Sequence, residues 1–429
     1  MNSIAVSNNP MKLRVLDAFA GAGGFSLGFH LAGSQVIGAI EQDAWAAETF
    51  AFNHKGCPVL VGNIENFTDN DLKAAFGSFA PNVIVGGPPC QGFSVCRKKT
   101  AGDPTDPRNS LFEEFIRLGR LFSPDFMVME NVPNLTAAKT KERRLVIDII
   151  VGELEELGYS VKYDILQAVD FGVPQIRKRL FVIASKTSIA NPFPDPTHGV
   201  LNPQGDFFSS YADITPTLWD AISDLPRLEA GEGEEQMTYT EAPKNAYQAE
   251  LRRGCGVLYN HVAMKHSRRM VQRFAAMKWG ESVSDVPDEL KPFGRNSNGV
   301  VSGRAYDQNN RRMHPDRQCH TIPASFYANF VHPYSDRNFT AREGARIQSF
   351  PDWYVFKGKP TVVSHKLLAR EGRFDEKYLC QYNQIGNAVP PLLAKAIAEN
   401  IKRQFEDIRS VCSWRQPDAE RESHIEVSG

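Results

Sequence analysis

The chain has 429 residues, enough for one large domain and a smaller one. Its composition, 42% hydrophobic and 23% charged, is that of an ordinary globular protein, and its formal net charge is −1. A polyanionic partner would therefore have to meet basic residues gathered on one face. The seven irregularly spaced cysteines argue against a disulfide framework, and neither a signal-peptide pattern nor a membrane-spanning apolar run is present. We expect a cytoplasmic monomer with no membrane partner.

Short apolar runs alternate with helical patterns over the first 185 residues. Strands are predicted at 13–18, 36–40, 83–85, 126–129 and 180–184, and helices from a glycine-rich turn to residue 31 and at 44–54, 111–121 and 143–157. This alternation predicts an α/β fold with a mostly parallel sheet covered by helices on both faces. In such sheets, ligands bind beyond the carboxyl ends of the strands.

The pattern breaks near Lys186, and the chain is irregular and rich in Pro, Gly and Asn up to about Tyr306. Residues 251–320 hold thirteen Lys and Arg against six Asp and Glu, an excess of seven. Such an excess suits a phosphate-facing surface, and on charge alone it suits a solvated basic face even better. Regular patterns return after Thr340, with an apolar helix predicted over 392–401.

A metal site could be imagined from Cys255, His261 and His266. No second cysteine pair lies at the spacing of a zinc finger, so scattered core and surface residues are the better interpretation. We expect no metal.

A glycine-rich turn over residues 19–25, Phe-Ala-Gly-Ala-Gly-Gly-Phe, follows the first predicted strand and opens a helix. Glycines allow a backbone to approach a ligand closely, and a helix N-terminus offers free N–H groups to a carboxylate or phosphate. Glu41 ends the next strand, twenty residues after Gly21, where a carboxylate suits two ribose hydroxyls. The dinucleotide fingerprint needs a third glycine where Ser26 stands. By itself, the turn therefore indicates a nucleoside site without fixing the ligand.

A second glycine-rich stretch, Gly-Gly-Pro-Pro-Cys-Gln-Gly-Phe-Ser at 86–94, follows the short strand predicted at 83–85. Two prolines stiffen the loop and fix the direction of Cys90. A cysteine in such a loop, at the carboxyl end of a strand, is well placed to be an exposed nucleophile, although a lone cysteine is more often a buried structural residue. Cys96 lacks such a loop, and we interpret it as structural.

Two further blocks place charges next to strands. Phe-Met-Val-Met-Glu-Asn-Val at 126–132 is an apolar strand that delivers Glu130 at its carboxyl end, to a site or simply to a turn. Gln-Ile-Arg-Lys-Arg at 175–179 enters the next predicted strand, and Arg177 and Arg179, two residues apart, would point to the same side of it. Two guanidinium groups on one side suit a carboxylate, a phosphate or a polarised carbonyl, but in isolation surface arginines are the better explanation.

Together and in this order, these blocks closely resemble the signature of DNA cytosine-5 methyltransferases. The resemblance continues in Gln-Ile-Gly-Asn-Ala-Val-Pro-Pro at 384–391, and in Thr-Ala-Arg-Glu at 340–343 with Gln-Ser-Phe-Pro at 348–351. The matches cover residues 13–185 and about 302–400, and Pro-Cys-Gln followed by Glu-Asn-Val is highly specific. The resemblance implies a Rossmann-like fold, S-adenosyl-L-methionine as methyl donor and double-stranded DNA as substrate. It leaves open a functional pairing with a cognate restriction endonuclease.

The resemblance also implies a catalytic role for each block. Cys90 would attack C6 of a cytosine flipped out of the duplex, which makes C5 reactive toward the methyl group. Glu130 would hold N3 and the exocyclic amine of the base and stabilise the negative charge that develops in the ring. Arg179 would lie near the base carbonyl, with Arg177 supporting the site.

The resemblance further implies that several blocks together hold the methyl donor. Phe19 would stack near the adenine, Glu41 would bind the ribose, and the segment of Asn387 and Val389 would close the pocket from the C-terminal side. The expected donor-binding residues are Phe19, Ala20, Gly21, Gly23, Gly24, Phe25, Glu41, Gln42, Asn63, Ile64, Pro89, Leu111, Asn387 and Val389.

Two features depart from the family pattern. The family often has an acid near the end of its third strand for the adenine amine. Here Asn63 stands at that position, so the hydrogen bond remains available without the charge. The stretch at 357–379 is longer than the family pattern leads us to expect, and it has no functional account. We predict a discontinuous catalytic domain at 1–185 and 378–412, a target-recognition domain and hinge at 186–377, and a disordered tail at 413–429.

Three alternatives remain at this point. An RNA cytosine-5 methyltransferase of the same family would share Cys90 and Glu130, but Pro-Cys-Gln-Gly-Phe-Ser and a recognition stretch of over a hundred residues favour DNA. A catalytically silent DNA-binding regulator would not need Cys90, Glu130 and Arg179 intact. A dinucleotide oxidoreductase is disfavoured by the missing third glycine.

Overall fold

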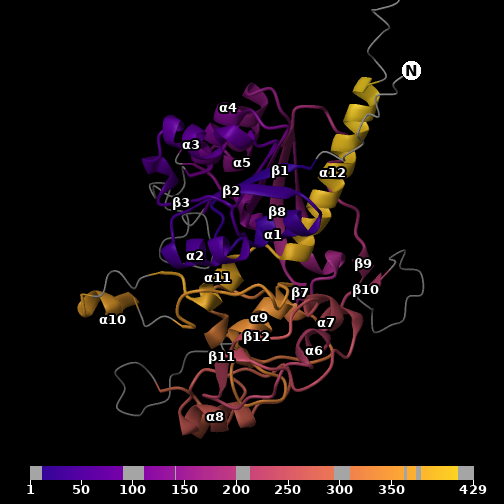
Figure 1. Ribbon diagram of the computed structural model, residues 1–429. Coiled ribbons are helices and arrows are strands. Elements are labelled where there is room, and N and C mark those ends of the chain that lie inside the picture. Colours follow the sequence, from indigo (N-terminus) through magenta and orange to yellow (C-terminus); the bar gives the residue numbers. More distant parts are fainter. Residues whose placement is uncertain are drawn as a thin grey trace, which may run out of the picture.

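The chain folds into two parts that lie one above the other in Figure 1, a large sheet flanked by helices and a second part of short strands and helices. The last long helix returns from the second part to the sheet. The computed structural model describes residues 12–89, 111–140, 142–199, 213–293, 310–361, 365–372 and 378–413. Cys90 and Cys96 lie outside these ranges.

A seven-stranded sheet forms the centre of the first part, in the order β3-β2-β1-β4-β5-β8-β6. β8 runs antiparallel to both of its neighbours, and the other pairings are parallel, as the sequence predicts. The strands are β1 (Arg14–Ala18), β2 (Gln35–Glu41), β3 (Val59–Val61), β4 (Val83–Gly86), β5 (Phe126–Asn131), β6 (Ser160–Gln167) and β8 (Lys178–Ser185).

Helices cover both faces of this sheet. Because successive residues of a strand face opposite sides, Val15 of β1 belongs to the core under α1 and α12, and Leu16 to the core under α3, α4 and α5. The helices are α1 (Gly24–Leu31), α2 (Ala44–Asn53), α3 (Asp69–Phe76), α4 (Leu111–Phe122), α5 (Val146–Glu156) and α12 (Pro391–Ser413).

Three elements of the first part, β3, β6 and α3, escape the sequence pattern, and β3 has only three residues. β6 is an edge strand with a half-exposed surface, and charged residues such as Lys162 and Asp164 interrupt its apolar character. α3 buries Leu72 and Phe76 and is otherwise polar, so its apolar face is too short to stand out. α5 also begins at Val146, three residues later than expected.

The second part is built differently. Within the described residues, its strands pair two by two and form no larger sheet. The pairs are β7 (Gln175–Ile176) with β14 (Cys319–His320), β9 (His198–Gly199) with β10 (Asp213–Ile214), β11 (Gly233–Met237) with β12 (Leu258–Val262), and β13 (Arg311–Arg312) with β15 (Phe330–Val331). The helices are α6 (Leu218–Ile222), α7 (Ala246–Leu251), α8 (Arg268–Ala275), α9 (Ala341–Ile347), α10 (His365–Arg370) and α11 (Gln381–Asn387).

The core of the second part reaches the first part at the glycine-rich turn. Ala22 and Leu27 belong to the same apolar cluster as residues of α6, α9 and α11. The cluster includes Tyr382 and Ile385, whereas Val389 packs in the core under α1 and α12. The domain boundary near residue 378 stays a prediction. Because Ile385 packs in the second part and Val389 packs under α1 and α12, the chain returns to the sheet at about residue 388.

Candidate active site

The glycine-rich turn lies between β1 and α1 and is tied to the end of β2. Gly21 donates its backbone N–H to one carboxylate oxygen of Glu41 at 2.6 Å, and Asp43 donates to the other at 2.8 Å. Burial raises the pKa of Glu41, and these backbone N–H groups oppose the rise. Phe19 shares the left-handed backbone of the turn with a φ of 60°, an unfavourable conformation that is typical of functional sites.

Ser26, which stands where a dinucleotide site has its third glycine, has a partner beneath the turn. Its hydroxyl donates to the carboxylate of Asp17 at 2.6 Å, and its backbone N–H donates to the same oxygen at 3.2 Å. Asp17 is buried in β1, and burial raises its pKa to about 7 against the two hydrogen bonds from Ser26. The serine therefore attaches the first turn of α1 to the sheet.

The C-terminal segment that carries Asn387 and Val389 packs against the start of α1. A Cβ atom added at Gly24 would lie 2.4 Å from the carbonyl oxygen of Val389, so this contact requires glycine. Val389 is 7% exposed, and Asn387, the last residue of α11, is exposed. The segment 387–389 thus lies beside the glycine-rich turn.

Glu130 and Arg179 form an ion pair at the carboxyl end of β5. β5 and β8 are antiparallel with Asn131 opposite Leu180, so the start of β8 meets the end of β5. The Nε atom of Arg179 lies 2.8 Å from a carboxylate oxygen of Glu130. Burial raises the pKa of Glu130, whereas Arg179 and Arg177 lower it, and the net shift is upward. The carboxyl group therefore keeps a proton more readily than a free glutamate.

The Pro-Pro loop is attached to the same strand end. The side-chain amide of Asn131 donates to the carbonyl of Pro88 at 3.0 Å, and a Cβ atom at Gly87 would lie 3.1 Å from the carboxylate of Glu130. Pro89 is half-buried and is the last described residue before Cys90. The chain therefore leads toward Cys90 from beside the Glu130–Arg179 pair.

Arg177 takes a different position from Arg179. It is 1% exposed, and its guanidinium donates to the carbonyls of Ile322, Gly386 and Ala388 at 2.9 to 3.2 Å. Burial lowers its pKa, and the neighbouring Arg179 adds to the shift. Arg177 thus joins the start of β8 to the segment that carries Asn387, which fits the supporting role that the family resemblance implies.

Comparison with known proteins identifies the family. The family model for C-5 cytosine-specific DNA methylases matches residues 13–403. The type II methyltransferase M.DdeI of Desulfomicrobium norvegicum is 47% identical over 93% of this chain and 91% of that protein. The type II methyltransferase M1.HphI of Haemophilus parahaemolyticus is 34% identical over 91% of this chain and 87% of that protein.

The chain belongs to the family of C-5 cytosine-specific DNA methylases. It is accordingly an enzyme that methylates cytosine in DNA at C5. A solved DNA modification methyltransferase encoded within an E. coli prophage covers 92% of this methylase and 100% of that chain, with a TM-score of 0.68 at 24% identity. This likeness confirms the expected methyltransferase fold.

The remaining donor-binding candidates fall into two groups. Phe25, Ile64 and Leu111 are buried in the two sheet cores, so their side chains serve packing and any ligand contact must come from their backbone or edges. Gln42 is exposed after Glu41, and Asn63 begins a short 3-10 helix with its amide 2.8 Å from the carboxylate of Glu65. Ala20 is held to β2 by a backbone hydrogen bond to Ile40. Their roles stay predictions.

Several residues around the methylase site escaped the sequence analysis. Asp17 could have been noticed as a charged residue inside an apolar strand, and Asn131 as part of the Glu-Asn-Val block. Tyr354 and His54, which lie beneath the glycine-rich turn, carry no local signal because their partners are far away in the sequence.

The possible metal ligands have other partners. Cys255 lies near the carbonyl of Val257, and the ring of His261 hydrogen bonds to Thr340 and to a backbone carbonyl. In the described part of the chain, no three His, Cys, Asp or Glu residues gather as metal ligands would. The same ranges contain no helix long and apolar enough to cross a membrane.

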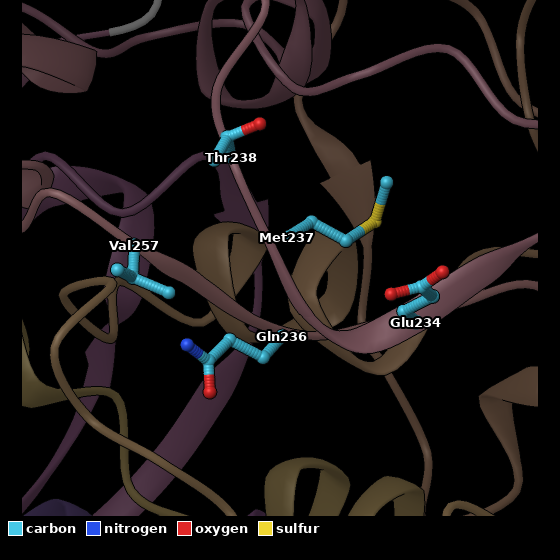
Figure 2. Close-up of a pocket in the computed structure, with 5 residues that line it drawn as sticks. All are labelled: Glu234, Gln236, Met237, Thr238 and Val257. Carbon is cyan, nitrogen blue, oxygen red and sulfur yellow. The ribbon is translucent and has the colours of Figure 1, made fainter.

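A surface cavity of about 360 Å³ lies over the hairpin of β11 and β12 (Figure 2). Glu234 and Gln236 line it together with Met237, Thr238 and Val257. None of the predicted site residues lines this cavity, so it carries no part of the candidate active site.

Proposed function

We propose that the methylase transfers a methyl group from S-adenosyl-L-methionine to C5 of a cytosine flipped out of a specific duplex sequence. The transfer passes through a covalent bond between Cys90 and C6 of the base. The observation that carries this proposal is the Glu130–Arg179 pair, which lies at a strand end beside the loop leading to Cys90. An acid with a raised pKa and a fixed arginine suit a base that must accept a proton during the reaction.

The glycine-rich turn and Glu41 fit S-adenosyl-L-methionine. A Cβ atom at Gly21 would meet nothing within 4 Å, so the turn has open space on that side. Among the first N–H groups of α1, that of Ser26 is taken by Asp17, whereas those of Gly24 and Phe25 have no partner inside the helix and can receive the carboxylate of the donor. Each oxygen of Glu41 accepts one backbone hydrogen bond and keeps a lone pair for a ribose hydroxyl. When bound, the donor supplies an electrophilic methyl group on a sulfonium.

The reaction begins when the thiolate of Cys90 forms a bond to C6 of the flipped cytosine. The electron pair of the C5–C6 double bond becomes available at C5, and Glu130 donates its proton to N3 and so neutralises the ring. Arg179 holds the carboxyl group in place and faces the base carbonyl. After C5 has accepted the methyl group, N3 returns its proton to the carboxylate of Glu130. Loss of the C5 hydrogen as a proton then restores the C5–C6 double bond and expels the thiolate of Cys90.

We propose further that sequence choice resides in residues 186–317. The catalytic blocks lie outside this stretch, and the local excess of basic residues lies within it. Lys265, Arg268, Lys278 and Arg317 are exposed there. Duplex DNA is the expected partner of this surface. A cognate restriction endonuclease would be paired with the methylase in function only, without binding to it.

The proposal is tested by a covalent trap. Fluorine at C5 cannot leave as a cation, so a duplex pool with 5-fluorocytosine at random sites should capture the methylase after methyl transfer. With S-adenosyl-L-methionine present, we expect a complex that survives denaturing electrophoresis and maps to the Cys90 peptide. Cys90→Ala should give no complex, whereas the control Cys255→Ala should give as much as wild type.

Fluorinated tRNA serves as the negative control, since the family acts on cytosine in DNA, and it should give no complex. Failure to trap a preparation that binds DNA and the donor would overturn the covalent mechanism.

A further inference from the structure

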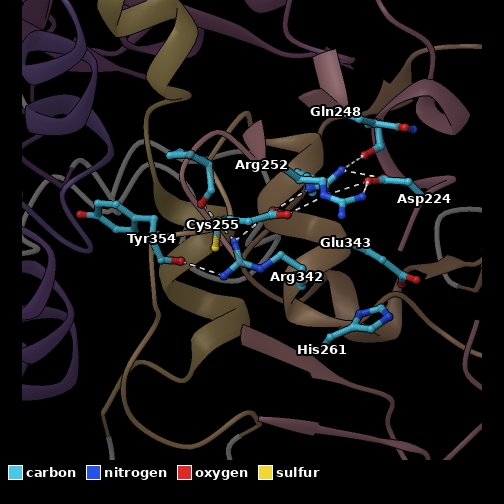
Figure 3. Close-up of polar contacts among 12 residues, drawn as sticks. Asp224, Gln248, Arg252, Cys255, His261, Arg342, Glu343 and Tyr354 are labelled. Carbon is cyan, nitrogen blue, oxygen red and sulfur yellow. Dashed lines mark hydrogen bonds and ion pairs between the residues drawn. The ribbon is translucent and has the colours of Figure 1, made fainter. Parts of the chain in front are cut away.

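Tyr354 connects the second part of the methylase to the glycine-rich turn. Its hydroxyl donates to the carbonyl oxygen of Ala22 at 2.5 Å, a contact between residues 332 positions apart in the sequence. Tyr354 is completely buried and packs on Phe350 and Phe356, with ring centroids 5.1 and 5.7 Å away. Figure 3 shows it at one side of the polar cluster that surrounds α9. The turn thus has a fixed contact outside the sheet.

The hydroxyl occupies the space that a glycine leaves free. A Cβ atom at Gly23 would lie 2.6 Å from the hydroxyl oxygen, and Gly23 has a φ of 86°, so this position needs glycine for two independent reasons. Gly23 is the N-cap residue of α1, directly before its first residue. A displacement of Tyr354 would therefore also displace the backbone N–H groups at the start of α1.

The charges around the hydroxyl keep it a hydrogen-bond donor. Burial raises the pKa of Tyr354 well above its usual value, and the nearby Asp17 adds to the rise. The ring of His54 lies 3.3 Å from the hydroxyl, and burial lowers its pKa to about 4, so it is neutral at physiological pH. The phenol therefore stays protonated at physiological pH, and its short contact with the carbonyl oxygen of Ala22 identifies that oxygen as the acceptor.

The residues after Tyr354 are attached to α2, the helix that follows Glu41. Val355 exchanges two hydrogen bonds with the side chain of Asn53, at 2.8 and 2.9 Å. The backbone N–H of Lys357 donates to the hydroxyl of Thr49 at 2.8 Å. One short segment, 354–357, therefore contacts both the glycine-rich turn and the helix that follows Glu41.

We propose that Tyr354 is a positioning residue for the methyl donor: its hydroxyl holds the carbonyl of Ala22, and with it the turn, at the distance from Glu41 that the donor needs. This inference rests on the proposed function, because it assumes that the turn and Glu41 bind S-adenosyl-L-methionine. Tyr354 touches neither donor nor base and acts through the backbone of the turn.

The test compares Tyr354→Phe with Tyr382→Phe. Tyr382 is 1% exposed, and its hydroxyl donates to the carbonyl of Phe339 at 2.9 Å, away from the turn, so it is a matched loss of one buried hydrogen bond. Titration calorimetry with S-adenosyl-L-homocysteine should give a Kd about tenfold higher for Tyr354→Phe, as expected for one buried hydrogen bond. The Kd of Tyr382→Phe should equal that of wild type, although both variants lose similar stability.

Kinetics provide the second measurement. Tyr354→Phe should raise KM for S-adenosyl-L-methionine by a similar factor while kcat at saturating donor and Kd for DNA stay within about twofold of wild type. An unchanged donor affinity in Tyr354→Phe, or an equal loss in both variants, would overturn the inference. Should Tyr354→Phe not fold, Asn53→Ala decides: it releases the 354–357 segment from α2 and should also weaken donor binding, and unchanged binding contradicts the inference. A wild-type methylase that binds no donor would instead refute the proposed function.

Discussion

The sheet part and the second part of the methylase place very different residues in their interiors. Two apolar clusters fill the faces of the sheet, and regular strands and helices satisfy the backbone. In the second part, where the paired strands have two to five residues, Arg337, Arg342, Glu343 and Arg346 are all at most 2% exposed. The two parts therefore depend on different interactions for their shape.

The buried charges of the second part are paired with one another around α9. Arg346 makes ion pairs with Asp224 at 2.9 Å and with Asp352 at 2.6 Å, and Arg337 meets Glu343 with two hydrogen bonds of 2.7 and 2.8 Å. Burial raises the pKa of Glu343, but the charge of Arg337, the hydrogen bonds that Arg337 donates and the neighbouring histidines together outweigh burial and hold the pKa well below its usual range. Since hydrogen-bonded charges tolerate few alternative arrangements, such pairs can specify which segments meet where long strands are missing.

Away from the Glu130–Arg179 pair of the candidate site, the sheet part has ion pairs at its surface. Arg117 contacts Asp69 and Glu114, both at 2.6 Å, with a quarter of its side chain exposed. Surface pairs of this kind contribute about 0–1 kcal/mol. In both parts one arginine lies between two carboxylates. The buried arginine, Arg346, helps to define the structure, whereas the partly exposed Arg117 contributes little to the free energy of unfolding.

The largest effect is expected from Arg346→Met. It leaves Asp224 and Asp352 without their shared partner, so that Asp224 keeps only Arg252 at 2.9 Å and Asp352 keeps Arg342 at 3.7 Å among the described arginines. Loss of one partner of a buried pair costs about 3–5 kcal/mol of the free energy of unfolding. The matched variant Arg117→Met should cost about 1 kcal/mol or less. Urea unfolding followed by circular dichroism measures both, and equal losses would contradict the comparison.

The sequence predicts the sheet part better than the second part for the same physical reason. β1, β4 and β5 are central strands buried on both faces, so each appears as a short continuous apolar run. α9 is buried along its whole length, yet Ala-Arg-Glu-Gly-Ala-Arg-Ile is the pattern of an exposed charged helix. Its burial depends on Asp224 and Asp352, of which the first lies more than a hundred positions away.

The candidate site divides in the same way. Glu130 and Arg179 could be predicted because the motifs stand next to strands, and antiparallel pairing of β5 with β8 brings them together. Arg177 could be named but not explained, since its partners are carbonyls contributed by segments near Ile322 and Gly386. Tyr354 could not be found at all, because a hydrogen bond over 332 positions leaves no periodic signal.

A second prediction separates chemistry from stability within the sheet part. Glu130→Gln cannot donate a carboxyl proton to N3 and lacks a charge for Arg179, so single-turnover methyl transfer should slow by a factor on the order of 10²–10³. The affinity for S-adenosyl-L-homocysteine should change little, because Glu41 and the glycine-rich turn are untouched. The control Glu156→Gln, an exposed residue at the end of α5, should react at the wild-type rate. Weakened donor binding with normal single-turnover chemistry would refute this division of roles.

The smallest effect is expected at the surface of the second part, where basic residues differ in what they already contact. Of the thirteen Lys and Arg at 251–320, several are engaged internally: Arg252 pairs with Asp224, Arg312 with Asp336, and Arg273 donates to the carbonyl of Leu290. By contrast, four exposed side chains make no hydrogen bond or ion pair with described residues, namely Lys265, Arg268, Lys278 and Arg317. These four are the candidates for phosphate contacts.

In a plot of the logarithm of the DNA association constant against the logarithm of the salt concentration, each phosphate contact adds about −0.9 to the slope. Lys265→Gln with Arg268→Gln should therefore flatten the salt dependence of DNA binding by about 0.9 for each side chain that contacts a phosphate, while kcat at saturating DNA stays unchanged. Lys55→Gln with Lys73→Gln removes the same charge from exposed positions of the sheet part and should leave the slope as in wild type. If both pairs flatten the slope equally, the effect comes from net charge and the basic residues of the second part form no DNA surface. If only the Lys265→Gln, Arg268→Gln variant flattens the slope, the second part, with its buried ion pairs, attracts the DNA. The sheet part then provides the residues for the chemistry.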